Sequence, residues 1–483
     1  MFYKGKSSGL EKCLSSLNLF FMGLANIIGP QIFIMLSGLI TISGIYGIFS
    51  LIICFVLAIL IALIFSELAL SMPTTGLVVN SVNDAWGRFV SFLVGWSQLF
   101  GNITFAAVCA LSFGVFINSP FIGAVVAVLV VTILELIGIT EIGKIESILV
   151  IAIIGVLLSI IVFNFPLVRQ LEPKLFVNIE LNNIKKIFLG VGFFFLAFTG
   201  FEDVTTYLEE AKNIKKVPIV MIVIIIVISS LFILIYLPLL SYINSGTNLS
   251  RPLHVLSKEL LKDKTNLVIT LIGISATLSS LITALSTSSR NMFSLSERGF
   301  IPKKFFYLSS RKIPVYSIIA SSFIVMLLLA IRKLDILVYL GNFLYFFIVI
   351  ILCFTVIRLR HKREKLSRPF KIPFFPFLPL ITAYLMLILM FFLDFKAIAF
   401  GLIWFFLGFI LYILRIVGKK RLRIALLGAN LVCSLLVILG SVLIGELYPH
   451  FKKNIYYVSY SFLFLFIVFG TGLIKDYFNK KGS

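Results

Sequence analysis

The chain has 483 residues, of which 60% are hydrophobic and only 13% are charged, a composition that excludes an ordinary soluble protein and indicates a membrane protein. The net charge of +22 could suggest a nucleic-acid partner, but most basic residues lie in short segments between apolar runs, so we expect none. The five cysteines and three histidines show no metal-ligand or catalytic spacing, and we therefore expect no metal, no cofactor and no enzyme.

Uncharged runs long enough to cross a bilayer, which takes ~20 residues, occur about fourteen times. They lie near residues 15–40, 45–70, 89–117, 119–137, 145–165, 187–208, 217–243, 266–296, 313–331, 335–357, 372–393, 397–414, 424–445 and 454–474. With the N-terminus inside the cell, most of the 42 Lys and Arg fall in cytoplasmic segments, as the positive-inside rule requires. The sequence therefore predicts an all-α polytopic protein of the plasma or inner membrane with both termini in the cytoplasm.

Two of these runs contain residues that interrupt a helix. The first holds Gly29-Pro30, and proline lacks an amide hydrogen and clashes with the preceding turn. The sixth holds Thr199-Gly200, followed at once by Glu202 and Asp203. Because unwound backbone and carboxylates are tolerated at membrane depth only against protein or water, the pattern predicts a hydrated site. Asp203, about 100° further round a helix than Glu202, is expected in solvent or in a structural pair.

The two breaks lie five spans apart, a spacing typical of transporters built from two inverted repeats. We predict a first repeat at 15–165 and a second at 187–360. Four peripheral spans then occupy 372–474, and cytoplasmic segments occupy 1–14 and 475–483. Beside the membrane, Glu67 and Asp84 are expected to pair with Arg88 or with a basic loop.

A series of short motifs accompanies the breaks. In order they are Phe65-Ser-Glu-Leu-Ala-Leu-Ser-Met-Pro-Thr-Thr-Gly76, Asn83-Asp-Ala-Trp-Gly-Arg-Phe89, Phe198-Thr-Gly-Phe-Glu202, Glu209-Glu-Ala-Lys-Asn-Ile-Lys-Lys-Val-Pro218, Ser296-Glu-Arg-Gly-Phe-Ile-Pro302 and Arg368-Pro-Phe-Lys-Ile-Pro373. In this order they resemble the permeases of the amino acid–polyamine–organocation (APC) superfamily of secondary transporters. The resemblance covers roughly residues 10–415. It implies a LeuT-like five-plus-five inverted-repeat core with discontinuous first and sixth spans and alternating access.

The resemblance also implies a substrate site. The family binds the substrate carboxylate on the broken first span, and the matching residues here are Gly29, Pro30 and Gln31. It binds the ammonium group on carbonyls of the two breaks, which here belong to Ile27, Leu196, Phe198 and Thr199. Further substrate contacts are expected from Asn26, Asn102, Gly200 and Ala284, and a gate from Phe198 and Phe195.

Departures from the family pattern refine this interpretation. Pro30 donates no amide hydrogen, so the Gln31 amide or a water must replace one contact to a carboxylate. The aromatic residues on which arginine/agmatine antiporters stack a guanidinium are here Leu196 and Ala284, which favours a neutral substrate. Glu202 matches the family's sixth-span acid and is the candidate proton carrier. Ser279 and Ser280 are candidate sodium ligands, since sodium-coupled relatives use two hydroxyls of the eighth span.

Together these features predict a permease that moves amino acids, preferably neutral ones, by secondary active transport. A proton is the first candidate for the coupling ion and sodium the second. Two alternatives stay open, namely an antiporter that exchanges amino acids for amines or polyamines and a non-transporting sensing or structural membrane subunit. The unusual Pro30-Gln31 pair favours the second alternative. The expected partners are a small-molecule substrate and the lipid bilayer, with the oligomeric state open.

Overall fold

A computed structural model describes residues 14–74, 76–137, 142–168, 181–243, 252–309 and 313–413. Within these residues the chain is helical, with an isolated bridge between Leu14 and Ala211 and no strand. Residues up to Phe405 belong to one compact unit, and the described part of the second unit, Phe406–Ser483, ends at residue 413. The predicted spans 424–445 and 454–474 and the tail 475–483 lie outside the described residues.

Each predicted span up to residue 414 contains helix. The α-helices are α1 (Ser16–Ile27), α2 (Leu36–Ser43), α3 (Gly47–Ser71), α4 (Leu77–Trp86), α5 (Arg88–Phe116), α6 (Pro120–Ile137), α7 (Ile142–Val168), α8 (Leu181–Phe194), α9 (Val217–Ile243), α10 (Pro252–Leu261), α11 (Thr265–Glu297), α12 (Val315–Leu329), α13 (Leu334–Lys362), α14 (Phe377–Met390) and α15 (Phe395–Tyr412). Short π or 3₁₀ segments are η1 (Gln31–Met35), η2 (Gly44–Tyr46), η4 (Phe195–Phe198), η5 (Phe201–Tyr207), η6 (Ile214–Lys216), η7 (Lys262–Lys264) and η8 (Lys303–Phe306).

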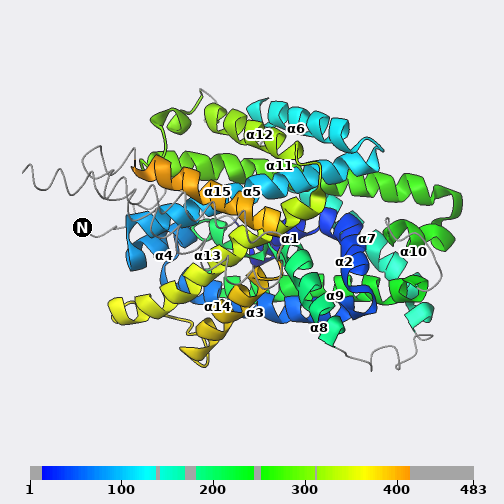
Figure 1. Ribbon diagram of the computed structural model, residues 1–483, viewed down its shortest axis with the longest axis horizontal. Coiled ribbons are helices and arrows are strands. Elements are labelled where there is room, and N and C mark those ends of the chain that lie inside the picture. Colours follow the sequence, from blue (N-terminus) through cyan, green and yellow to red (C-terminus); the bar gives the residue numbers. More distant parts are fainter. Residues whose placement is uncertain are drawn as a thin grey trace, which may run out of the picture. The chain divides into compact units, whose positions relative to one another are not determined.

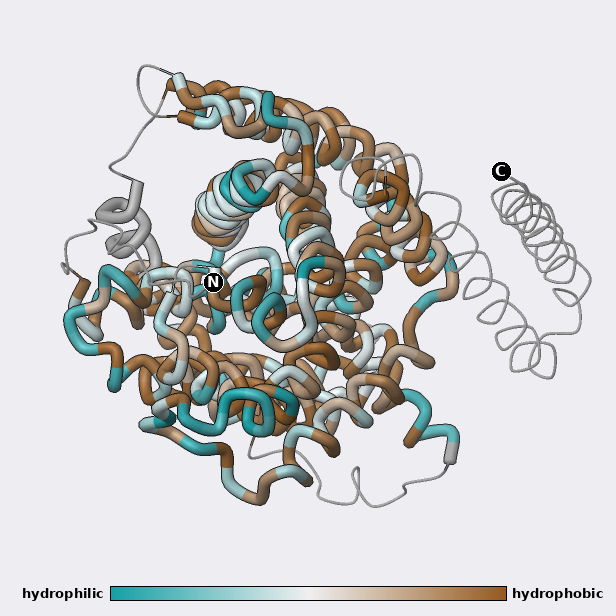
Figure 2. Tube along the Cα trace, turned by 90° about the vertical axis from the view of Figure 1, so that its left-hand side faces the viewer, coloured by the Kyte–Doolittle hydropathy of each residue, from teal (hydrophilic) through white to brown (hydrophobic). Residues whose placement is uncertain are grey.

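Nine helical stretches of the described residues are long and apolar enough to cross a membrane, and α1, α12 and α14 are shorter apolar helices. Figure 2 shows hydrophobic residues along most of these helices and hydrophilic ones gathered at connections. The chain is thus a multi-pass helical membrane protein, as predicted, while the total of fourteen spans stays a prediction.

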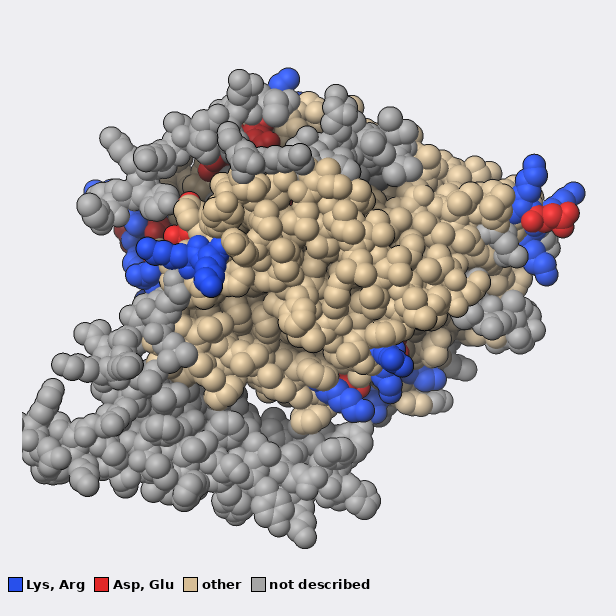
Figure 3. Space-filling model, turned by 90° about the horizontal axis from the view of Figure 1, so that it is seen from above, with Lys and Arg blue, Asp and Glu red and all other residues tan. Residues whose placement is uncertain are grey.

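Large apolar side chains cover the outward faces of the helices. Examples are Ile122 on α6, Val162 on α7 and Phe323 on α12, with 68%, 73% and 60% of their surface exposed. Figure 3 shows a broad face without Lys, Arg, Asp or Glu between charged groups toward its two ends. An uncharged face that carries many large apolar side chains is stable against lipid and would aggregate in water.

Helix α5 is the central element of the first unit. It packs against α4, α6, α11, α12 and α13, and Figure 1 shows it beside α11 along much of its length. Small residues permit this close packing: a Cβ atom on Gly114 would lie 2.2 Å from the Pro120 carbonyl oxygen, and one on Gly273 of α11 would lie 2.2 Å from the Phe116 ring. Glycine therefore sets the helix separation here, as is common in membrane bundles.

Both predicted helix breaks are present. α1 ends at Ile27, Ile28 is extended with ψ 91°, and helix resumes after Pro30 as η1 and then α2. α8 passes into 3₁₀ geometry at Phe195, and Thr199 is extended with ψ 150°. Gly200 follows with φ +115°, a backbone angle that side-chain-bearing residues rarely adopt. The chain continues as 3₁₀ helix through Tyr207, so the second break is longer than one residue.

Glu67 joins the end of α3 to α13 and to the segment before α14. Its carboxylate is 3% exposed and accepts hydrogen bonds from Arg360 Nε at 2.8 Å and from Arg360 Nη2 at 2.6 Å. It also accepts one from the Ile372 amide at 2.8 Å, and Arg368 Nε lies 3.8 Å away. Asp84 pairs with Arg363 at 3.3 Å. The two acids thus pair with basic residues at and after the end of α13, in line with the expected basic-loop partner, and not with Arg88.

A pair of tryptophans joins α5 to α15. The Trp96 indole donates to the Trp404 carbonyl at 2.9 Å, and the Trp404 indole donates to the Trp96 carbonyl at 3.0 Å. The two rings are stacked with centroids 4.3 Å apart, and Phe100 stacks on Trp404 at 3.9 Å. Both buried indole N–H groups are thereby satisfied, as the membrane interior requires.

Candidate functional site

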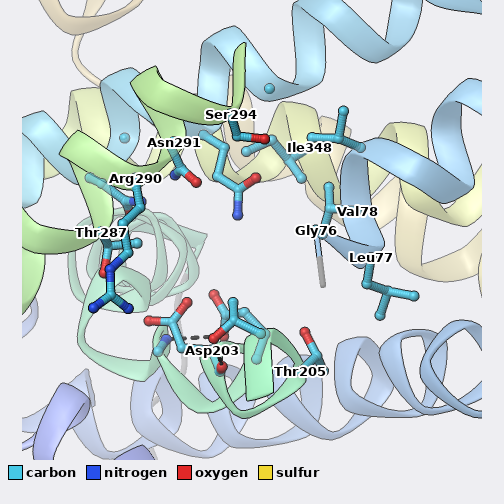
Figure 4. Close-up of a pocket in the computed structure, with 18 of the residues that line it drawn as sticks. Gly76, Leu77, Val78, Asp203, Thr205, Thr287, Arg290, Asn291, Ser294 and Ile348 are labelled. Carbon is cyan, nitrogen blue, oxygen red and sulfur yellow. Dashed lines mark hydrogen bonds between the residues drawn. The ribbon is translucent and has the colours of Figure 1, made fainter. Parts of the chain in front are cut away.

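A cavity of about 700 Å³ lies where the two broken helices face α5 and α11. Its wall also includes residues from the end of α3, from α4 and from α13. Figure 4 shows α11 with Thr287, Arg290, Asn291 and Ser294 on one side and Asp203 and Thr205 of η5 on the other. The cavity extends from the helix breaks to the end of the bundle where α4 lies, since Gly76, Asn80 and Glu209 also line it.

Gly200 organises the second break. Its positive φ turns the chain so that its amide donates to the Glu202 carboxylate at 3.0 Å. The Thr199 hydroxyl donates back to the Leu196 carbonyl at 2.8 Å. The Glu202 carboxyl group therefore closes a small turn at the cavity wall, where it lies beside the hydroxyl of Tyr345 on α13. That hydroxyl is buried against the Glu202 carboxyl group.

Asp203 lines the same cavity as Glu202 and is also paired with a neighbouring side chain, in line with the expectation of solvent or a structural pair. Residues 201–207 form 3₁₀ helix, whose angular step per residue is wider than that of an α-helix, so the local geometry does not by itself bring the two acids together. The Asn26 side chain of α1 donates to the Asp203 carboxylate at 3.3 Å, so this acid links the two broken helices. Both acids of the motif thus reach the cavity.

The predicted substrate residues divide into two groups. Those that line the cavity are Asn26, Asn102, Leu196, Thr199, Gly200 and Ala284, together with the candidate proton carrier Glu202 and the candidate sodium ligand Ser280. Those that do not line it are Ile27, Gly29, Pro30, Gln31, Phe195, Phe198 and Ser279. The structure therefore brings Leu196 and Thr199 of the ammonium side and the two asparagines to the cavity. Ile27 and Phe198 of that side, and the whole carboxylate side, are buried and do not line it.

Ser280 separates the cavity from that buried group. A Cβ atom on Gly29 would lie 2.2 Å from Ser280 Oγ and 2.8 Å from Gln31 Oε1, so these three residues are in close contact. Gln31 is 0% exposed, and both its amide atoms, like Ser280 Oγ, are buried without a hydrogen-bond partner among the described residues. Buried polar atoms without partners are unfavourable. A ligand, an ion or a rearrangement of the helices would supply the partners that these atoms lack.

The candidate gate residues lie in an aromatic cluster beside the second break. Phe198 packs edge-on against Phe194, with centroids 6.3 Å apart, and against Phe232 of α9 at 5.4 Å. Phe195 packs against Phe346 and Tyr345 of α13 at 5.5 and 5.9 Å. Both phenylalanines are fully buried, and their gating role stays a prediction.

Sequence reasoning overlooked a polar stripe on α11. Ser280, Thr283, Thr287, Asn291 and Ser294 line the cavity, and Arg290 and Glu297 lie on the same face. Steps of three or four residues place side chains on one helix face. The spacing of these polar residues in the sequence could therefore have predicted a cavity wall, whereas the hydroxyl groups of this helix were interpreted as a sodium site.

Comparison with known proteins agrees with this geometry. A methylthioribose transporter of Bacillus subtilis (strain 168) is 24% identical over 442 residues, which span 85% of this chain and 95% of the relative. A gamma-aminobutyric acid permease of the same organism is 25% identical over 336 residues, or 65% of this chain and 71% of the relative. The branched-chain amino acid permease BcaP of that organism is 24% identical over 437 residues, or 84% and 93%. Because residues 14–414 also match the amino acid permease family, the chain belongs to that family of membrane transporters and is not an enzyme.

Proposed function

We propose that the protein is a secondary active transporter that moves amino acids across the plasma or inner membrane by alternating access. The observation that carries the proposal is that two interrupted helices, α1 and α8, meet at one cavity, which is lined by Asn26 beside the first break and by Thr199, Gly200 and Glu202 of the second. Interrupted helices at a polar cavity are the usual device by which secondary transporters bind substrate inside a bilayer.

The proposed architecture is a five-plus-five inverted repeat with fourteen spans and cytoplasmic termini. The interruptions of α1 and α8, five predicted spans apart, support the repeat. The excess of Lys and Arg in alternate connections supports the orientation. In that orientation α4 and the C-terminal end of α11 are cytoplasmic, so the cavity faces inward and the described conformation is one that releases substrate into the cell.

A neutral amino acid is the preferred substrate. The cavity wall near the second break is apolar at Leu196 and Ala284, and Gly341 of α13 leaves room beside Leu196. One of the relatives is named as a branched-chain amino acid permease, and branched-chain amino acids are neutral. Another is named as a gamma-aminobutyric acid permease, whose substrate carries its amino group away from the α-carbon. Polar residues of the two breaks are left to hold the charged groups of the substrate.

A proton is the first candidate for the coupling ion, and Glu202 is its proposed carrier. The carboxyl group lies at the break, bonded to the Gly200 amide, so a change in its protonation alters the turn that joins the two half-helices. Sodium is the second candidate because Ser280 Oγ and the Gln31 side chain are buried together without partners.

Uptake of radiolabelled amino acids by purified protein in liposomes tests the proposal. Proton-driven uptake should require Glu202, and Glu202→Gln should abolish it while leaving exchange of internal for external substrate. Glu209→Gln, which changes a second carboxylate of the same cavity wall, is the matched control and should keep proton-driven uptake.

The other outcomes separate the alternatives. Uptake that requires a sodium gradient would shift the coupling site to Ser280 and Gln31. Uptake that requires internal amino acid or amine would make the protein an antiporter. Absence of uptake under all three conditions would reject transport and favour a sensing or structural subunit.

A further inference from the structure

Arg290 contributes a positive charge to the cavity that the helix-break site does not use. The residue is exposed and lines the cavity from α11, and Figure 4 shows its side chain extending toward the segment that carries Asp203. Within the described residues no acidic oxygen lies within 4.0 Å of its guanidinium group. A guanidinium with unused N–H donors at a cavity wall is suited to bind a carboxylate through two parallel hydrogen bonds.

Asp203 contributes the opposite charge on the facing wall. Its only hydrogen bond to a side chain in the described part of the chain comes from Asn26, and no Lys or Arg nitrogen of that part lies within 4.0 Å. The Thr206 hydroxyl donates to the Asp203 backbone carbonyl at 2.7 Å and stabilises the turn that presents the carboxylate. A carboxylate that lines a cavity with lone pairs unused is suited to bind an ammonium group.

Neighbouring side chains support the two charges. Thr287 and Asn291 flank Arg290 on the polar face of α11, and Asn291 Nδ2 is buried without a partner. Behind Arg290, Glu135 of α6 lies beside Ser286 and within electrostatic reach of the guanidinium. Glu135 does not line the cavity and forms no ion pair within 4.0 Å with Arg290 among the described residues, so it attracts the guanidinium without neutralising it through direct contact.

We propose that Arg290 and Asp203 form a second substrate site, in which a zwitterionic amino acid binds with its carboxylate on Arg290 and its ammonium group on Asp203. The site lies between the helix breaks and the open end of the cavity, and it rests on the proposed transport function. Because the buried carboxylate side of the first site, at Gly29 and Gln31, is outside the cavity in this conformation, a substrate leaving the breaks meets this pair of charges next.

Water in the cavity screens both charges, so this site is weaker than one enclosed in protein. Each of the two contacts should contribute roughly a tenfold increase in affinity, the amount that corresponds to one charge-assisted hydrogen bond. The site should therefore bind zwitterions and discriminate against molecules that carry only one of the two charges.

Equilibrium binding to the purified full-length protein tests the proposal. The probe is the tritiated common amino acid that wild-type liposomes take up fastest. The wild type should bind it in a strong and a weak phase, and added choline chloride should weaken the second phase preferentially. Arg290→Gln and Asp203→Asn should each remove the weak phase and leave the strong one. The amine and the carboxylic acid that correspond to the probe should compete poorly for the weak phase.

Two further variants exclude loss of folding as the explanation. Arg290→Lys keeps the positive charge and should retain the weak phase, with an affinity between those of the wild type and of Arg290→Gln. Arg363→Gln, at a surface pair with Asp84, removes a positive charge elsewhere and should change neither phase.

A single binding phase in the wild type, or a weak phase unchanged in Arg290→Gln and Asp203→Asn, would overturn the second site while leaving the transport function intact. Loss of both phases in Arg290→Gln and Arg290→Lys would place Arg290 in the first site and would also overturn it. Absence of uptake for every amino acid would reject the transport function itself, and the second site with it.

Discussion

Replacing Gly200 with alanine perturbs the second helix break directly. The φ of +115° places this residue outside the regions that alanine adopts freely, at a cost of about 1–2 kcal/mol. A Cβ atom would also lie 3.2 Å from Ile27 Cγ1 and 3.4 Å from Asn26 Cβ, so the two breaks would have to move apart slightly. The total destabilisation should be about 1–3 kcal/mol, and the strain is located at the contact between the two interrupted helices.

Gly155 provides the matched control. It lies within α7, and a Cβ atom added there meets nothing within 4 Å. Gly155→Ala should stabilise the protein by about 0.5–1 kcal/mol, because alanine is the better helix former. The two variants make the same chemical change and should shift stability in opposite directions.

Thermal unfolding in detergent, followed by the loss of monodisperse protein, measures the difference. Gly200→Ala should melt below the wild type and transport more slowly, while Gly155→Ala should melt at or above the wild type with unchanged uptake. An equal or higher melting temperature for Gly200→Ala than for Gly155→Ala would refute the view that the positive φ at this break is required.

Three further changes test other contacts. Arg360→Ala should destabilise the protein by about 3–5 kcal/mol, because it leaves the carboxylate of Glu67 buried without its bidentate partner, and thermal unfolding would show it. Trp96→Phe and Trp404→Phe should show a favourable coupling of about 0.5–1.5 kcal/mol in a double-mutant cycle, because the two indole rings are stacked on each other; additive effects would contradict this. Gly101→Leu should lower uptake of bulky amino acids without lowering the melting temperature, because a Cβ atom there meets nothing within 4 Å and the residue lines the cavity.

Much of the fold follows from local sequence. Apolar runs of sufficient length predict helices, since a helix is the form in which a single segment satisfies its own backbone hydrogen bonds in lipid. Proline at position 30 and glycine at position 200 predict the two breaks for equally local reasons, namely a missing amide hydrogen and access to positive φ. These properties belong to the residues themselves, and both breaks appear where they were predicted.

The composition of the cavity wall depended on geometry that the sequence does not contain. Asp203 lines the cavity and accepts a hydrogen bond from Asn26 because η5 packs against α1, although the two residues are 177 positions apart in the sequence. Arg290 is one of many basic residues near a predicted helix end, and its place opposite Asp203 appears only when α11 packs beside the second break. Facing residues far apart in sequence are fixed by packing, so no local pattern reveals them.

The sequence by itself thus determined that this is a multi-pass helical permease with two interrupted helices and an acid at the second break. The tertiary structure alone decided that Gln31 is enclosed behind Ser280 and that Glu67 pairs with Arg360. It also decided that two opposite charges face one cavity. The physical reason is that chain stiffness, amide hydrogen bonding and side-chain hydrophobicity act within a few residues, whereas burial and charge pairing depend on how distant helices come together.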